Sequence, residues 1–94
     1  MSNVIIPVIN LNGSSAAYLL IMHRAALDVL RSAQVSLCAL APNGRDYQTA
    51  EPGSLELACE QHFKRVADLE LLIADLTEIT LGIYGQTVSR KTRG

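Results

Sequence analysis

The chain has 94 residues, enough for one domain with a single hydrophobic core and too few for two. Hydrophobic residues make up 49% of the chain and charged residues 18%, below the ~25% of an average globular domain, which excludes a disordered chain. Eight Lys and Arg against nine Asp and Glu leave a net charge of −1, so that any site for an anion must be local.

The start of the sequence has neither the basic segment nor the cleavage site of a signal peptide. The most apolar run, residues 16–22, is far shorter than the ~20 residues of a membrane span. We therefore expect a soluble, cytoplasmic protein. We expect no metal and no cofactor, because Cys59 and His62 would need Cys38 and His23 to converge on them from distant positions.

The first residues predict an extended arm followed by a helix start. β-Branched residues surround Pro7, which is typical of an arm or edge segment. Either Ser14 or Ser15 can then cap a helix. We divide the chain into an N-terminal arm (residues 1–13), a helical hairpin domain (14–85) and a flexible basic tail (86–94) with Arg90, Lys91 and Arg93.

Residues 16–41 contain no Gly or Pro and predict a long amphipathic helix. Pro42-Asn43-Gly44 should end it, with a left-handed Asn or Gly. The apolar stripe at three- and four-residue steps consists of Leu19, Met22, Ala26, Val29, Ala33, Leu37 and Leu40. Further apolar residues lie off this stripe and predict contacts between copies of the chain: Leu20, Ile21, Leu27, Leu30 and Val35.

A second helix is expected over residues 54–84, with Ser54 as its cap and with Gly82 and Gly85 fraying its end. Its four-three pattern indicates the seam of an antiparallel helical pair. This seam consists of Ala58, His62, Arg65, Leu69, Leu72, Leu76, Ile79 and Ile83. The predicted fold is all-α: an antiparallel two-helix hairpin with a short extended N-terminal arm, assembled into a homo-oligomeric helical bundle.

His62 and Arg65 lie one helical turn apart, so both can meet a single ligand, and the guanidinium suits phosphate. The structural alternative is a hydrogen-bonded His62 in the seam and an Arg65 that pairs with Asp46 or Asp68.

Two loop segments are further candidates for the site. Tyr47 can stack on a base while Arg45 holds a phosphate; the alternative is a connecting turn in which Arg45 pairs with Asp46. Asn12 and Gly13 can present amides to an anion or a base edge, or they can serve only as a turn before the helix. The sequence has no nucleophile elbow, HExxH or P-loop motif, so we do not expect an enzyme.

These segments resemble, in order and spacing, the motifs of the helical hairpin domain of phage anti-CBASS and Thoeris anti-defence proteins, over about residues 9–83. The residues that carry the resemblance are Asn10-Leu11-Asn12-Gly13-Ser14, Pro42-Asn43-Gly44-Arg45-Asp46-Tyr47, and His62 with Arg65. Ser14 stands where relatives have Thr, and Gln48 where they have a second aromatic residue, which leaves the choice of ligand open.

The resemblance implies a sponge in the host-cell cytoplasm that sequesters cyclic di- or trinucleotides, or cyclic ADP-ribose-type signals, without cleaving them. It also implies a homo-oligomer, a hexamer in particular, that needs neither a membrane nor a long nucleic acid. By similarity the ligand-binding positions are Asn12, Gly13, Arg45, Tyr47, His62 and Arg65, with Asp46 beside them. A rival from another class is a helical-hairpin adaptor for other proteins, or a regulator that binds nucleic acid weakly.

Overall fold

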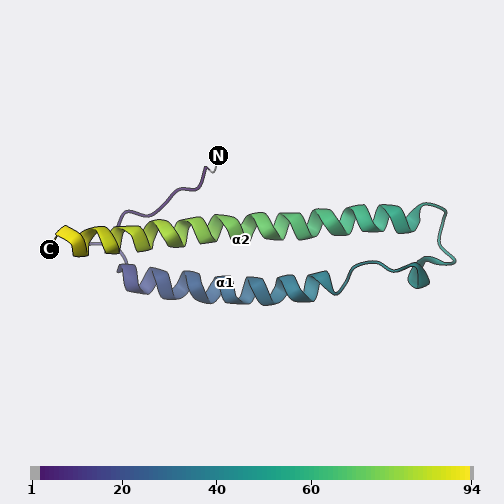
Figure 1. Cartoon of the computed structure of the whole chain (residues 1–94), viewed down its shortest axis with the longest axis horizontal. Coiled ribbons are helices and arrows are strands. Elements are labelled where there is room, and N and C mark those ends of the chain that lie inside the picture. Colours follow the sequence, from purple (N-terminus) through teal and green to yellow (C-terminus); the bar gives the residue numbers. More distant parts are fainter. Residues whose placement is uncertain (1–2, 94) are drawn as a thin grey trace.

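The computed structural model describes the backbone of residues 3–93 and the side chains of residues 3–88. It contains helix α1 (Ala16–Cys38), a single 3-10 turn η1 (Gly44–Tyr47) and helix α2 (Ser54–Arg93). The two long helices run antiparallel and pack along their length in a rod of 67 × 24 × 22 Å (Figure 1). Residues 3–93 contain no strand. The predicted all-α hairpin with an N-terminal arm is confirmed.

Helix α2 is longer than the sequence pattern predicts. It has 40 residues and passes through Gly82 and Gly85 without a break, so the predictions of fraying there and of an end near Tyr84 are wrong. The side chains of Arg90, Lys91 and Arg93, and the whole of Gly94, lie outside the described residues.

The helix ends show which capping predictions hold. Ser15 caps α1, because its Oγ accepts a hydrogen bond from the Tyr18 amide at 3.1 Å. Helix α1 then ends at Cys38 with a right-handed Ala39, so the predicted left-handed closure is wrong. Within residues 3–93 the one residue with positive φ is Gly53 (φ 87°), which directly precedes α2. Its carbonyl accepts from the Leu57 amide, so the cap falls one residue before Ser54.

Six of the eight residues of the seam predicted for α2 are confirmed. His62 and Ile83 are buried, and Ala58, Leu69, Leu76 and Ile79 are half-buried. Arg65 and Leu72 are exposed instead. The residues that follow them, Val66 and Ile73, are half-buried in their place.

Most of the apolar stripe predicted for α1 points away from α2. Five of its seven residues are exposed: Met22, Ala26, Val29, Ala33 and Leu40. The face that packs on α2 carries Leu20, His23, Leu27, Leu30, Gln34 and Leu37, and Leu27 is only 5% exposed. His23 and Gln34 interrupt this face with polar side chains, so the spacing of apolar residues alone does not reveal it. His23 Nδ1 lies 2.7 Å from the Leu19 carbonyl oxygen, which satisfies that ring atom inside the hairpin.

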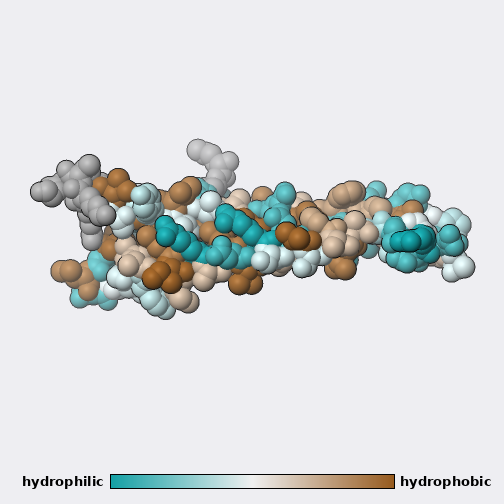
Figure 2. All heavy atoms as spheres, turned by 60° about the horizontal axis from the view of Figure 1, so that its bottom comes forward, coloured by the Kyte–Doolittle hydropathy of each residue, from teal (hydrophilic) through white to brown (hydrophobic). Residues whose placement is uncertain are grey.

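The residues predicted to form contacts between copies therefore fall into two groups. Leu20, Leu27 and Leu30 pack within the hairpin, whereas Ile21 and Val35 are exposed as predicted. Other large apolar side chains, Tyr18, Met22 and Val29 among them, join the exposed set. Figure 2 shows such apolar patches over both helices, while the loop end of the rod is hydrophilic.

None of the described helices has an apolar stretch long enough to cross a membrane.

The N-terminal arm lies along the last turns of α2 (Figure 1). The Ile9 amide donates to Gln86 Oε1 at 3.0 Å, and Gln86 Nε2 donates to the Pro7 carbonyl at 2.7 Å. The Ile6 side chain sits directly on Gly82, where any Cβ would lie 2.5 Å from Ile6 Cδ1. Gly82 is therefore a site of close approach between arm and helix.

Alanine at Gly82 is expected to be less favourable than alanine at Gly85. Within a helix Ala is favoured over Gly by roughly 0.5–1 kcal/mol, and Gly85 has no atom within 4 Å to oppose a methyl group. At Gly82 the methyl group would displace Ile6. Denaturant unfolding should show Gly85→Ala to be more stable than the parent. Gly82→Ala should gain less or lose stability, with faster hydrogen exchange at the Ile9 amide. Equal gains at both positions would show that the arm does not pack on Gly82.

Candidate functional site

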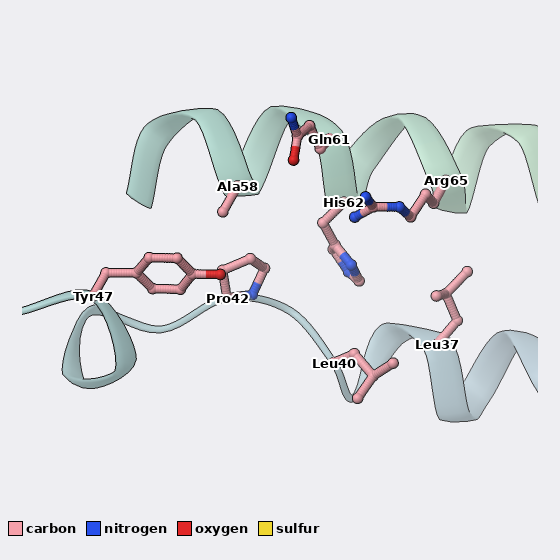
Figure 3. A pocket seen from close by; sticks show the side chains of 8 residues that line it. All are labelled: Leu37, Leu40, Pro42, Tyr47, Ala58, Gln61, His62 and Arg65. Carbon is pink, nitrogen blue, oxygen red and sulfur yellow. The ribbon is translucent and has the colours of Figure 1, made fainter. Parts of the chain in front are cut away.

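A cavity of about 300 Å³ lies at the loop end of the hairpin (Figure 3). The end of α1, the connecting segment and the first turns of α2 each contribute to its wall. The lining residues are Leu37, Leu40, Pro42, Tyr47, Ala58, Gln61, His62 and Arg65. Its volume is at the lower end of the range for small-molecule sites, and its wall combines apolar side chains with a few polar ones, as such sites do.

The loop positions Tyr47 through a short hydrogen-bonded turn. Asn43 Oδ1 accepts from the Arg45 amide at 3.0 Å, and Asn43 Nδ2 donates to Asp46 Oδ2 at 3.0 Å. These two bonds close the 3-10 turn, at whose end Tyr47 is half-buried and lines the cavity. Asn43 and Asp46 thus hold the turn. The alternative in which Arg45 pairs with Asp46 is not found.

His62 is buried as a residue, at 6% exposure, yet it makes no side-chain hydrogen bond. No fully buried side-chain nitrogen or oxygen in the described residues lacks a hydrogen-bond partner. The ring nitrogens of His62 are therefore not completely buried, and Figure 3 shows the ring projecting from α2 into the space above Leu40. The hydrogen-bonded seam residue considered as the alternative is not found. His62 offers the cavity an unengaged donor or acceptor.

Arg65 is exposed and lines the same cavity as His62 (Figure 3). Both carboxylates considered as its partners are engaged elsewhere. Asp46 accepts from Asn43, and Asp68 pairs with Lys64 at 2.8 Å, which is the one ion pair within the described side chains. The guanidinium is therefore free to bind an anion at the cavity mouth.

The other candidate residues are not brought to this cavity. Arg45 is exposed in η1 and does not line the wall. Asn12 and Gly13 precede α1, whose 23 residues span ~34 Å to the cavity end of the rod. Before α1, at the end of the rod away from the cavity, Asn10 Oδ1 accepts a hydrogen bond from the Asn12 amide at 2.9 Å, and the Asn10 carbonyl accepts one from the Gly13 amide. Asn12 and Gly13 thus belong to the turn considered as the alternative.

Sequence reasoning missed part of the wall. Gln61 precedes Arg65 by four residues, so the two share one helix face, and this spacing was the available signal. The contribution of Leu37, Leu40 and Pro42 depends on how α1 ends, which the apolar pattern placed three residues too late. Within the described residues, no three His, Cys, Asp or Glu side chains come together in a group that suits a metal ion.

Comparisons of the chain with protein-family models, with curated proteins and with solved structures found no match.

Proposed function

We propose that the protein is a phage-encoded sponge that binds cyclic oligonucleotide or cyclic ADP-ribose-type immune signals and leaves them intact. The observation that supports this best is the cavity in which Tyr47, His62 and Arg65 meet. These residues come from two motifs of the family that the sequence resembles, and the fold gathers them around one hollow. The Tyr47 ring suits the base of a nucleotide, the free Arg65 guanidinium suits its phosphate, and the His62 imidazole suits either.

Each of the three residues has a distinct task in this proposal. Arg65 forms charge-assisted hydrogen bonds with a phosphate, for which its planar fork is suited. The Tyr47 ring stacks on a base, and the His62 nitrogens bond to the phosphate or to a base edge.

Assembly of several copies is part of the proposal. The exposed apolar side chains of both helices support a homo-oligomer, and the resemblance suggests a hexamer. Asn12 and Gly13 can join a ligand at the cavity only from a neighbouring copy, because α1 separates them from it within one hairpin. Repeated copies of Arg65 around a symmetry axis would match the repeated phosphates of a cyclic ligand.

The second candidate function, a helical-hairpin adaptor for another protein, is favoured by the same exposed apolar surface. The two functions differ in what stabilises the protein. An adaptor responds to its protein partner and not to cyclic nucleotides.

A thermal-shift panel of cyclic dinucleotides, cyclic trinucleotides and cyclic ADP-ribose isomers tests the proposal. A ligand at 100 times its Kd stabilises the folded state by about 2.7 kcal/mol, which raises the Tm of a domain of this size by several degrees. We expect such a rise with at least one class. The absence of any rise across the panel would favour the adaptor.

The ligand recovered after binding is expected to be chemically intact. The protein is incubated with the cyclic nucleotide that raises its Tm and is then denatured by heat, and the released nucleotide is identified by chromatography and mass spectrometry. Linear or hydrolysed product above a control without protein would show that the chain is an enzyme.

A further inference from the structure

A second hollow, of about 310 Å³, lies along the middle of the hairpin and takes no part in the site described above. We call it the arginine groove. Arg24 and Arg31 of α1 line it, Tyr84 of α2 faces them, and Leu27 and Leu81 contribute apolar surface between them.

The two arginines of the groove have no acidic partner. The single ion pair within the described side chains involves neither of them. They are seven residues apart on one helix, so their backbones are separated by ~10.5 Å. An apolar hollow between two free guanidinium groups suits an apolar surface that carries an acidic group at each end.

Helix α2 carries such a surface, which we call the acidic face: Asp68, Leu71, Leu72 and Asp75. Their spacing of three, four and seven residues puts all four on one side of the helix. Leu71 is 65% exposed and Leu72 is 46% exposed, so the described part of the chain leaves much of their apolar surface uncovered. Asp68 and Asp75 are also seven residues apart, which gives the two acids the same ~10.5 Å separation as the two arginines.

The groove and the acidic face lie on opposite flanks of the hairpin. Tyr84 of the groove directly follows Ile83, which is buried in the seam. Asp75 of the acidic face directly precedes Leu76, which is half-buried in the same seam. At ~100° per residue, these steps lead to opposite sides of the seam. One chain therefore cannot fill its own groove, but two chains side by side can.

We propose that the acidic face of one copy docks in the arginine groove of the next. Leu71 and Leu72 then cover the apolar part of the groove, and Asp75 approaches one of the two arginines. Asp68 approaches the other, and for this it exchanges its solvent-exposed ion pair with Lys64 for the arginine of the neighbouring copy. Because the two surfaces differ, the contact is heterologous, and its repetition joins more than two copies, in a closed ring if the rotation from copy to copy closes. Arg65 precedes Asp68 by three residues on the same flank, so the docked neighbour also borders the candidate cavity.

Paired charge reversals, measured without any ligand, test this contact. Size-exclusion chromatography with light scattering gives the mass of the parent and of the variants R24E/R31E and D68K/D75K. We expect a parent larger than a dimer and a loss of this mass in each double variant. An equimolar mixture of the two variants should regain it, since each supplies the surface that the other needs. The quadruple variant R24E/R31E/D68K/D75K should regain it alone.

The control is E56K/E60K, which reverses two exposed acids of α2 that are not part of the acidic face, and it should keep the parent mass. Circular dichroism checks that every variant keeps its helix content. If a double variant loses it, L71S/L72S takes its place and should dissociate the oligomer without a change of charge.

Three results would overturn the proposal: a monomeric parent, double variants that keep the parent mass, or folded double variants whose mixture stays dissociated. A monomeric parent whose Tm rises with pyrophosphate, and whose response R24E/R31E abolishes, would assign the groove to a small anion instead. None of these measurements involves a cyclic nucleotide, so the contact and the proposed function can fail separately.

Discussion

Leu27→Asp is expected to unfold the hairpin. Leu27 is 5% exposed and lies in the middle of the face that α1 packs against α2. The substitution removes a buried aliphatic side chain, which costs about 2–5 kcal/mol, and it buries a carboxylate without a partner, which costs several more. A small domain has only about 5–15 kcal/mol in total. Circular dichroism at 25 °C should show most of the helical signal lost.

Val29→Asp is the matched control, because Val29 is on the same helix but is 68% exposed. It should keep the helical signal at 25 °C that Leu27→Asp loses. The sequence pattern alone placed Leu27 in contacts between copies. A Leu27→Asp protein that stays fully helical and merely dissociates would restore that interpretation and contradict the packing described here.

Arg65→Ala is expected to weaken ligand binding by roughly ten- to a hundredfold per site. This range corresponds to the ~1.5–3 kcal/mol of a hydrogen bond to a charged group. The stability of the hairpin should not change, because Arg65 is exposed and has no carboxylate partner in the described residues. Calorimetry with the cyclic nucleotide that gives the largest thermal shift measures the affinity, and elution volume reports the assembly.

Arg45→Ala provides the control for Arg65→Ala. Both arginines are near the loop end, but Arg45 does not line the cavity. Its removal should change the affinity much less, and binding to the parent should weaken with added salt. An intact oligomer in which Arg65→Ala binds every cyclic nucleotide as tightly as the parent would remove Arg65 from the site.

The four-three spacing of α2 was sufficient to identify His62, Leu69, Leu76 and Ile83, because an antiparallel pair needs such a seam whatever its register. The rotation of α1 could not be read in the same way. An apolar count favours the face with Met22 and Val29 over the face interrupted by His23 and Gln34. Packing tolerates these two polar residues because His23 bonds to the Leu19 carbonyl of its own helix and the half-buried Gln34 donates to Glu70 of α2. A hydrophobicity pattern registers neither bond.

Only part of the candidate site could be predicted from the sequence. His62 and Arg65 are neighbours on one helix, so their proximity followed from spacing alone. That Tyr47 would join them depended on a turn closed by Asn43 and Asp46. The exclusion of Asn12 and Gly13 depended on the direction of α1, which carries the chain the length of the hairpin between them and the cavity. Gly82 was misread for a related reason: its missing side chain serves a contact with Ile6, distant in sequence.

The two hydrogen bonds between the arm and Gln86 join positions 77 and 79 residues apart in the sequence. During synthesis the arm is made before α2, and its binding site emerges only after most of α2. The two helices can pair through contacts that are nearer in sequence, starting at the connecting loop. The contacts between the arm and Gln86 close a much longer loop and form later. In each newly made molecule, Ile6 and Ile9 therefore remain undocked until the turn of α2 that carries Gln86 has been made, and the arm is ordered after the hairpin on which it packs.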